Sequence, residues 1–503
     1  MHDDPLGLNR GGAPGGQADQ GWNLPHVEPT NLIALWPHDE PPTQAEVIAA
    51  LDHHWDGVEV LDELDPPSEQ VLWGIALEGG PLAHPAVVWA EAARQLPPGD
   101  LNDALAESCS WALGVESSLD TDDPLASYQH LVRFLAAPFD DTPGMLDVNT
   151  TGWINREAIR EQFLPEDNVP PIEALWIVHA VSPDRWGADI APPAKSGGGS
   201  TPGGTGHAGP EALRRSGAAS GGGSASGGGS ASGGVWLHTH GLWRCGRPEL
   251  EMLEVEGEFV ASAGSLINDL AERILDGPPP APGEPFRLGE NLTVVLQPWQ
   301  VVVPHVDPGS PGGAGDREQD DHGVHTGVRA VICDEKPRGM FRKLWVWPRL
   351  AIERLQNDQA LIWKSSRATL RMATQARYTW GELATVFAKL RPHLHDNPDR
   401  SRAMVLAKAS FPHAAVETGD ETAEHMWLQI LRFDGERLEG RLLNEPMFVA
   451  GVTSGDVMWI ERDRLSEWRV MSDAGSFGPS DVAALWRAVD AIAASPGGEG
   501  GRR

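Results

Sequence analysis

A tract of glycine, serine, alanine and threonine over residues 196–234 most constrains how this chain can fold, and GGGSAS occurs twice in it, over Gly221–Ser232. Such a composition cannot bury enough apolar surface to offset its conformational entropy. A flexible chain of this length has a root-mean-square reach of about 34 Å. We therefore expect a flexible linker at 196–234 that joins independently packed α+β domains.

The tract and the chain length together predict about three domains, because 503 residues divide into units of about 150. The glycine-rich start and the tail cannot bury an apolar core and are expected to be disordered, as is a polar insertion. The expected parts are a disordered start at 1–29, an acidic α+β sandwich at 30–195, a second α+β domain at 235–369 with its disordered loop at 307–327, a β-rich module at 370–495, and a tail at 496–503.

Hydrophobic periodicity supplies the elements of the first domain. Thr43-Gln-Ala-Glu46 is a capping box that starts a helix, with Val47 and Leu51 on its apolar face. Asp123-Pro124 starts a second helix that runs to Ala136. The remaining predictions are a helix over Pro85–Leu96 and strands over Leu32–Trp36, Val71–Leu77, Trp111–Val115 and Ile172–Val181.

After the tract, a helix over Phe259–Leu275 ends at Gly277-Pro278, as a glycine followed by prolines predicts. Helices are also expected over Pro348–Asn357 and Thr379–Leu390, the latter with a Thr379…Glu382 capping box. From Arg402 short strands joined by the turn signal Asp434-Gly435 predict a half-open barrel. Predicted strands are Val235–Leu237, Leu250–Val255, Leu292–Leu296, Val328–Cys333, Ala403–Ala409, Met426–Phe433, Leu438–Leu443 and Val457–Ile460, before a closing helix at Ser480–Ala493.

The charge balance limits the partners. Acidic residues number 72 and basic residues 39, and residues 1–200 alone hold 33 acidic and 7 basic side chains. Because phosphate contacts need clustered Lys and Arg, we do not expect a nucleic-acid partner. Tryptophans are interleaved in the basic stretch Lys336–Arg377. We interpret them as core residues, and we expect the cations either to cover them or to face the acidic first domain. The expected partner is a protein.

The spacing of the cysteines and the length of the apolar runs indicate the cellular compartment. Cys109, Cys245 and Cys333 lie far apart without a CxxC motif, so neither a disulfide framework nor a thiolate zinc site is expected. The start Met1-His2-Asp3-Asp4 does not resemble a signal peptide, and no apolar run approaches the ~18 residues that span a bilayer. We therefore predict a cytoplasmic protein without a membrane partner.

Several motifs near the C-terminus occur in a fixed order: Glu424-His-Met-Trp-Leu428, Asp434-Gly435, Gly440-Arg-Leu-Leu-Asn-Glu-Pro446, Gly455-Asp456 and Ser466-Glu-Trp468. Together they resemble the YegJ-like bacterial domain of unknown function. Trp236-Leu-His-Thr-His-Gly-Leu242, followed by Pro248-Glu-Leu-Glu251, resembles the segment before that domain in larger uncharacterised bacterial proteins. The N-terminal domain is similar to the first domain of those proteins. The resemblance implies an architecture and no established activity.

The most suggestive residues for chemistry are His238 and His240. Histidines two apart on a strand project to one face, where a divalent metal could bind with a carboxylate from Glu249 or Glu251. The alternative is that histidines beside a glycine turn orient the backbone by hydrogen bonds. His393 and His395 repeat the spacing in a turn-rich segment, and His322 and His325 lie in the polar insertion, so these four are interpreted as surface residues.

Asn444 and Glu445 follow a strand in the C-terminal module, where an amide and a carboxylate could contact a ligand or partner. The alternative is that Asn444 satisfies turn backbone. Three functions are therefore carried forward: a non-catalytic cytoplasmic binding or scaffold protein without a cofactor, a metal-dependent hydrolase that uses His238 and His240, and a toxin-neutralising or stress-response protein.

Overall fold

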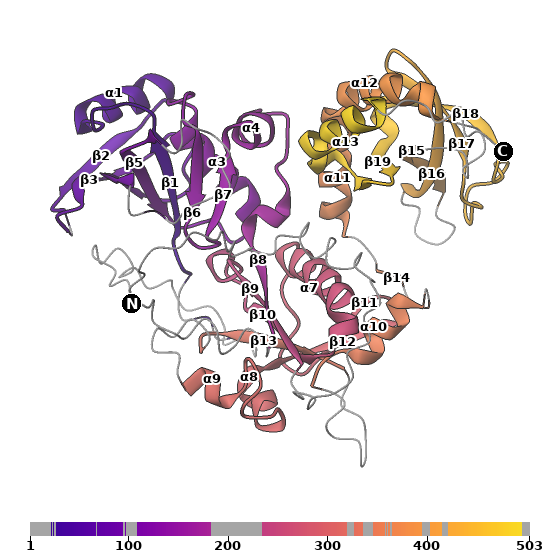
Figure 1. Cartoon of the computed structure of the whole chain (residues 1–503), viewed down its shortest axis with the longest axis horizontal. Coiled ribbons are helices and arrows are strands. Elements are labelled where there is room, and N and C mark those ends of the chain that lie inside the picture. Colours follow the sequence, from indigo (N-terminus) through magenta and orange to yellow (C-terminus); the bar gives the residue numbers. More distant parts are fainter. Residues whose placement is uncertain are drawn as a thin grey trace, which may run out of the picture. The chain divides into compact units, whose positions relative to one another are not determined.

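The computed structural model describes residues 22, 24, 27–66, 68–93, 96, 108–182, 234–318, 326–334, 346–357, 359, 361–362, 365–394, 403–414 and 421–494. The chain divides into two compact units, Met1–Leu164 with Ile172–Trp363, and Pro165–Pro171 with Lys364–Arg503. The first unit holds two seven-stranded sheets, A and B, and the second holds a six-stranded sheet C (Figure 1). The expected mixed α+β class is confirmed.

Sheet A has the strand order β2-β3-β4-β5-β1-β6-β7, and every neighbouring pair is antiparallel. Helix α3 (Pro124–Ala136) packs against β1 and β5 and buries Tyr128, Leu131 and Leu135. Helix α1 (Gln44–His54) begins with the predicted capping box between Thr43 and Glu46. The strands are β1 (Thr30–Trp36), β2 (Glu59–Leu64), β3 (Val71–Glu78), β4 (Ala86–Ala92), β5 (Trp111–Ser117), β6 (Gly144–Asp147) and β7 (Gly152–Asn155).

One prediction for this part of the chain was wrong, and a second was correct only in part. The segment Pro85–Leu96 contains strand β4 instead of a helix, because its β-branched residues pair between two other strands. Val88, for example, lies opposite both Ile75 and Val115 and is fully buried. The predicted strand Ile172–Val181 is a short 3₁₀ turn, η4 (Ile172–Leu175), followed by strand β8 (Ile177–Val181). The acidic edge strand β2 was not predicted, because almost all of it is exposed.

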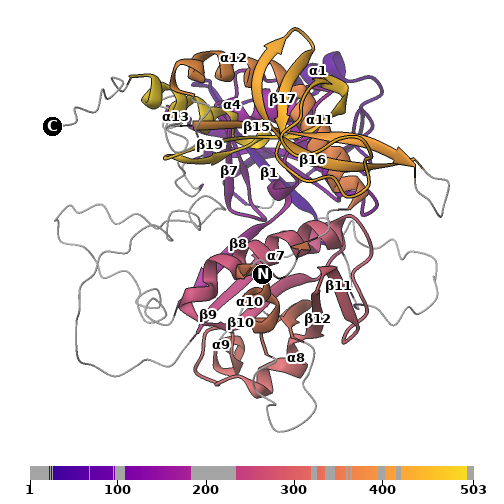
Figure 2. The ribbon, with the colours of Figure 1, turned by 90° about the vertical axis from the view of Figure 1, so that its right-hand side faces the viewer.

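Sheet B has the order β14-β11-β12-β13-β10-β9-β8. Its pairs are antiparallel apart from the parallel pair of β10 with β13. Helix α7 (Val260–Leu275) covers one face, where α10 (Arg349–Gln356) packs beside it, and α8 (Trp299–Val302) and α9 (Ala314–Glu318) lie on the other (Figure 2). The remaining strands are β9 (Val235–His240), β10 (Glu249–Val255), β11 (Pro285–Glu290), β12 (Leu292–Pro298), β13 (Arg329–Cys333) and β14 (Leu361–Ile362).

The glycine- and serine-rich tract occupies a different place in the topology from the one expected. Strands β8 and β9 are neighbours in sheet B, with His179 opposite His238. Residues 196–234 therefore belong to the connection between two paired strands of one sheet, and they do not separate two sheets. Apart from Gly234, the tract itself lies outside the described residues.

The polar insertion 307–327 was expected to be a disordered surface loop, and residues 307–318 differ from that expectation. They include α9 and the buried Arg317, whose guanidinium donates to both carboxylate oxygens of Glu251. Gly312 packs so closely on Trp236 that an added Cβ would lie 2.8 Å from the indole. The buried ion pair orders a segment whose composition favours a loop; residues 319–325 lie outside the described part.

Sheet C is an antiparallel sheet in the order β18-β17-β16-β15-β19-β20. Its edge strands β18 and β20 do not pair with each other, so it is not a closed barrel, and the half-open curvature stays a prediction. The turn at Asp434-Gly435 joins β16 to β17 as predicted, with Gly435 at φ +63°. The strands are β15 (Ala403–Ala414), β16 (Glu421–Asp434), β17 (Arg437–Leu442), β18 (Val457–Glu461), β19 (Leu465–Ser472) and β20 (Gly475–Phe477).

Three helices accompany sheet C, namely α11 (Ser366–Tyr378), α12 (Trp380–Leu390) and α13 (Val482–Ala494). Sheet C and these helices share a core that includes Trp380, Leu383 and Leu485. The predicted capping box at Thr379 is absent, because the Thr379 hydroxyl donates to Gln375 O of the preceding helix instead. The expected disordered tail 496–503 and all of the start except Trp22, Leu24 and residues 27–29 lie outside the described residues. Nowhere in the described part does a helix combine the length and apolar character needed to cross a membrane.

Candidate metal centre

Three histidines converge on one face of sheet B. His238 and His240 lie two apart on β9, and His179 lies on the adjacent strand β8. One ring nitrogen of each histidine lies within 4.8 Å of one ring nitrogen of the other two. Within the described ranges, no other cluster of three His, Cys, Asp or Glu side chains has this geometry.

The strand register brings the three rings together. In an antiparallel pair, residues directly opposite each other project to the same face, and so do residues two apart on one strand. His179 is opposite His238, and Ile177 is opposite His240. The His240 ring therefore lies diagonally across from His179, and its ring centroid is 4.9 Å from that of His179 and 4.9 Å from that of His238.

The three histidines differ in how deeply they are buried. His238 is 2% exposed and stacks on the buried Trp236 at a centroid separation of 4.0 Å. His179 and His240 are half-buried. The inner ring is thus fixed by packing against the indole, whereas the outer two border solvent, and an ion could enter from their side.

Neither carboxylate that was expected to complete the site joins it. Glu249 accepts hydrogen bonds from the Thr239 hydroxyl at 2.6 Å and from the backbone N–H groups of Gly241 and Trp243. Glu251 accepts from Arg317 and from Trp236 Nε1. Both carboxylates are buried and engaged in these bonds, so the third candidate ligand is His179 instead.

Three neutral imidazoles form a donor set suited to Zn²⁺ and to other divalent transition metals, whereas Mg²⁺ and Ca²⁺ prefer oxygen. Zinc–nitrogen bonds of about 2.0–2.1 Å in a tetrahedral site place the donors about 3.3 Å apart. The observed separations of up to 4.8 Å would therefore have to close by side-chain rotation. Three ligands leave one tetrahedral position open, as in catalytic zinc sites.

His179 was not identified from the sequence as a ligand, although it falls in a segment predicted as a strand. The signal that was missing is the pairing of β8 with β9, whose ends are separated by residues 182–234. No local spacing rule connects residues that far apart.

Of the other histidines that were considered, the structure describes only His393, which is not part of a three-residue cluster of His, Cys, Asp or Glu. His393 ends a 3₁₀ turn, η9 (Arg391–His393), and is half-buried. His322, His325 and His395 lie outside the described residues.

Asn444 and Glu445 lie on the exposed loop between β17 and β18, and both accept backbone hydrogen bonds. Asn444 Oδ1 accepts from Trp427 N at 2.6 Å, and Glu445 Oε2 accepts from Ser454 N at 3.3 Å. The nearby Glu424 accepts from the N–H groups of Met447 and Phe448. These polar side chains hold the loop in place.

Two cysteines lie in the core of sheet B and its turns. Burial raises the pKa of the Cys245 thiol to about 12. Burial, together with the charge of Asp334, raises the pKa of Cys333 well above its usual value. Neither thiol forms a thiolate near neutral pH, so neither is an activated nucleophile.

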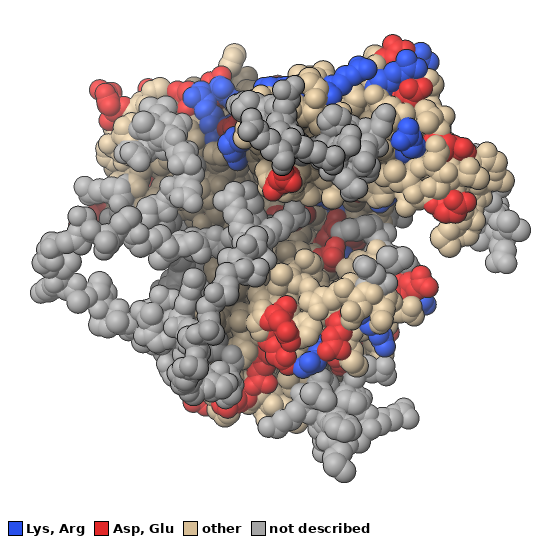
Figure 3. Space-filling view, turned by 45° about the vertical axis from the view of Figure 1, so that its right-hand side comes forward, with Lys and Arg blue, Asp and Glu red and all other residues tan. Residues whose placement is uncertain are grey.

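The described part of the basic stretch matches the interpretation of core tryptophans and covering cations. Trp347 is buried against Phe259, and Arg349 lies over its ring and pairs with Glu256 and Glu353. Trp345 and Trp363 lie outside the described residues. Basic and acidic side chains are interspersed on the face seen in Figure 3.

Two segments of the chain match protein-family models. Residues 225–329, which contain β9 with His238 and His240, match the C-terminal part of a protein of unknown function, DUF4026. Residues 396–491 match DUF2314, an uncharacterised protein conserved in bacteria. No curated protein and no solved structure matches the chain. These matches support the expected multi-domain family of unknown function.

Proposed function

We propose that this protein binds a divalent transition metal ion, Zn²⁺ in the first instance, through His179, His238 and His240. The single observation that carries the proposal is the convergence of three histidines from two paired strands, with one ring nitrogen of each within 4.8 Å of the others. This arrangement supplies the third ligand that the sequence left open.

The chemistry of the site follows from its ligand count. Three neutral ligands leave the full positive charge of the ion in place and one coordination position open. A zinc ion bound there would lower the pKa of a water in that position and would so supply a nucleophile near neutral pH. The metal-dependent hydrolase is therefore the activity that we propose to test once binding is established.

Equilibrium dialysis against Zn²⁺, followed by elemental analysis, tests the proposal on the full chain. The wild-type protein should retain about one ion per chain, and His179→Ala, His238→Ala and His240→Ala should each lose at least about tenfold in affinity. His84→Ala is the matched control, because the His84 side chain is exposed. Ser117 Oγ donates to the backbone carbonyl of His84, and the substitution keeps that carbonyl. Equal zinc binding by all five proteins, or none in any, would overturn the proposal.

A second candidate is the cytoplasmic binding or scaffold protein, with a YegJ-like C-terminal module and a protein partner. Its support is the loop between β17 and β18, where Met447 is 80% and Phe448 is 64% exposed. The loop is anchored rather than loose, because Glu424 accepts hydrogen bonds from both of their backbone N–H groups. Exposed apolar side chains on an ordered loop are typical of binding surfaces.

A photo-crosslinking amino acid at position 448 tests this second candidate in cells. A specific protein adduct at 448, absent when the crosslinker replaces the equally exposed Leu370, would support it. The same pattern of adducts at both positions would argue against a binding surface on this loop.

A further inference from the structure

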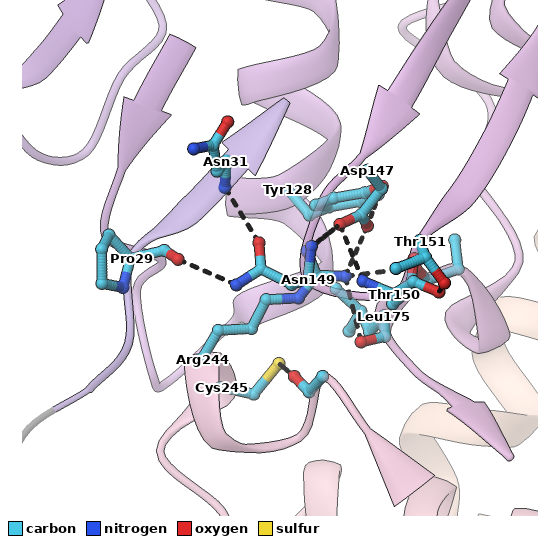
Figure 4. Close-up of polar contacts among 12 residues, drawn as sticks. Pro29, Asn31, Tyr128, Asp147, Asn149, Thr150, Thr151, Leu175, Arg244 and Cys245 are labelled. Carbon is cyan, nitrogen blue, oxygen red and sulfur yellow. Dashed lines mark hydrogen bonds and ion pairs between the residues drawn. The ribbon is translucent and has the colours of Figure 1, made fainter. Parts of the chain in front are cut away.

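The turn that follows the histidine strand is fixed by a buried ion pair. Arg244 lies in the 3₁₀ turn η6 (Trp243–Cys245), four residues after His240. Its Nη1 and Nη2 donate to Oδ1 and Oδ2 of Asp147 at 2.9 and 2.8 Å, and the two side chains are 0% and 2% exposed (Figure 4). Asp147 ends strand β6, so the pair joins sheet A to sheet B inside one compact unit.

Aromatic and backbone groups complete the surroundings of the pair. The Tyr128 hydroxyl donates to Asp147 Oδ2 at 2.8 Å, and its ring lies 4.8 Å from the Arg244 guanidinium carbon. Burial alone would lower the pKa of Arg244, but the charge of Asp147 and its hydrogen bonds, together with smaller contributions from Tyr128 and Cys245, outweigh burial and raise the pKa. Arg244 is therefore held as a cation next to the carboxylate.

The same guanidinium also reaches the start of the other histidine strand. Arg244 Nη2 donates to Leu175 O at 3.0 Å and to Ala174 O at 3.3 Å. Leu175 lies two residues before β8 begins and four before His179. Arg244 thus belongs to the turn just after β9, and its side chain forms hydrogen bonds with the backbone just before β8.

Gly241 allows this close approach. It directly follows His240 and has φ +113°, and an added Cβ would lie 2.3 Å from Leu175 O. The turn after β9 therefore lies directly against the segment that leads into β8. The strands that carry the three histidines are held to each other at this end.

We propose that Asp147 and Arg244 are positioning residues for the histidine cluster, which fix β8 and β9 relative to each other and couple metal affinity to sheet A. This inference rests on the proposed metal-binding function. Neither residue is itself a ligand. Removing the Asp147 charge leaves the Arg244 cation buried and free to turn from Leu175 O, which loosens the register on which the donors depend.

Zinc affinity, measured by competition with a chromophoric chelator, tests the inference in Asp147→Asn, Arg244→Lys and the double variant. We expect each single variant to lose about tenfold or more, in the range found when groups that orient metal ligands are removed. The double variant should lose no more than the worse single one, because both substitutions disrupt the same pair. Asp334→Asn is the matched control, because Asp334 is a buried carboxylate directly after β13 that accepts a hydrogen bond from Leu350 N, and its substitution should not change the affinity.

Tyr128→Phe is the milder variant in case the others fail to fold, because it removes only the hydroxyl that donates to Asp147. It should weaken zinc binding by a smaller factor. Unchanged affinity in every folded variant, with zinc bound by the wild type, would overturn the inference and leave the proposed function standing. Additive losses in the double variant would also overturn it, since they would indicate general destabilisation.

Hydrogen exchange of metal-free protein separates the two proposals if the wild type binds no zinc. Faster exchange of the amides in 177–181 and 235–240 in Asp147→Asn, with slow exchange kept in sheet C, would show that the pair holds the strands although the metal proposal has failed. Equal exchange in the wild type and the variant would overturn the positioning role.

Discussion

Arg317 Nη2 lies 2.8 Å from each carboxylate oxygen of Glu251, and the two side chains are 3% and 0% exposed. The Arg317 guanidinium also lies over the rings of Trp236 and Trp299. This pair ties α9 to the centre of sheet B, next to the indole on which His238 stacks. It explains why a segment rich in glycine and proline is ordered over 307–318.

Breaking this pair by Glu251→Gln should lower the free energy of unfolding by about 3–5 kcal/mol, because it leaves the Arg317 charge buried without its counter-charge. The double variant Glu251→Leu with Arg317→Met should recover much of that loss, since no charge then remains buried. Urea denaturation followed by circular dichroism measures both. A loss below about 1 kcal/mol in the single variant would show that the pair is effectively solvated.

Gly241→Ala should be strongly destabilising for its size. Its backbone has φ +113°, which side-chain-bearing residues rarely adopt, and the new methyl group would meet Leu175 O and Trp176 Cα. We expect a loss of at least about 2 kcal/mol together with weaker zinc binding. Gly257→Ala is the control, because its added Cβ meets nothing within 4 Å. Equal unfolding midpoints for the two variants would contradict the described packing.

Asp334→Asn should stabilise the protein in a pH-dependent way. Burial raises the pKa of Asp334 to about 6, although Oδ2 accepts a hydrogen bond from Leu350 N at the start of α10. In the unfolded chain the carboxyl group titrates near its ordinary value of about 3.9. The native state therefore binds the extra proton between these values, and the wild type loses stability as the pH rises through about 4 to 6.

The neutral amide of the variant does not carry that cost. The stability difference between Asp334→Asn and the wild type should therefore be small near pH 4 and should favour the variant by on the order of 1–3 kcal/mol near pH 7. Denaturant titrations of both proteins across this range check the sign. A difference that is constant with pH would mean that Asp334 titrates normally.

Thr379→Val should destabilise the second unit. The Thr379 hydroxyl accepts a hydrogen bond from Nε1 of the fully buried Trp468 at 2.9 Å and donates to Gln375 O at 2.8 Å. Valine removes both bonds and leaves the indole N–H buried, at a cost of about 1–3 kcal/mol. Thr379→Ser keeps the hydroxyl and should cost much less. Similar losses for valine and serine would assign the effect to packing of the methyl group.

Local structure was predicted well from the sequence where it depends on side chains that lie close together in the chain, such as helix caps and tight turns. The capping box at Thr43 and Glu46, the Asp123 cap of α3 and the turn at Gly435 are all present, because each depends on residues within one turn of the chain. Segment Pro85–Leu96 was mispredicted because its strand pairing on both edges depends on β3 and β5, which lie elsewhere in the sequence.

The candidate site was half predictable for the same reason. His238 and His240 are close because they share a strand, and their i, i+2 spacing is visible in the sequence. His179 reaches them only because β8 pairs with β9 across the glycine-rich connection, and composition indicated a domain boundary there. Likewise, the Asp147–Arg244 pair joins residues 97 positions apart, which no periodicity connects.

Zinc K-edge X-ray absorption of the zinc-loaded wild-type protein tests the central claim most directly. Coordination by His179, His238 and His240 predicts three imidazole nitrogens at about 2.0–2.1 Å, with the outer-shell scattering that imidazole rings produce. A spectrum that shows oxygen ligands without imidazole scattering, or a protein that retains no zinc to measure, would contradict it.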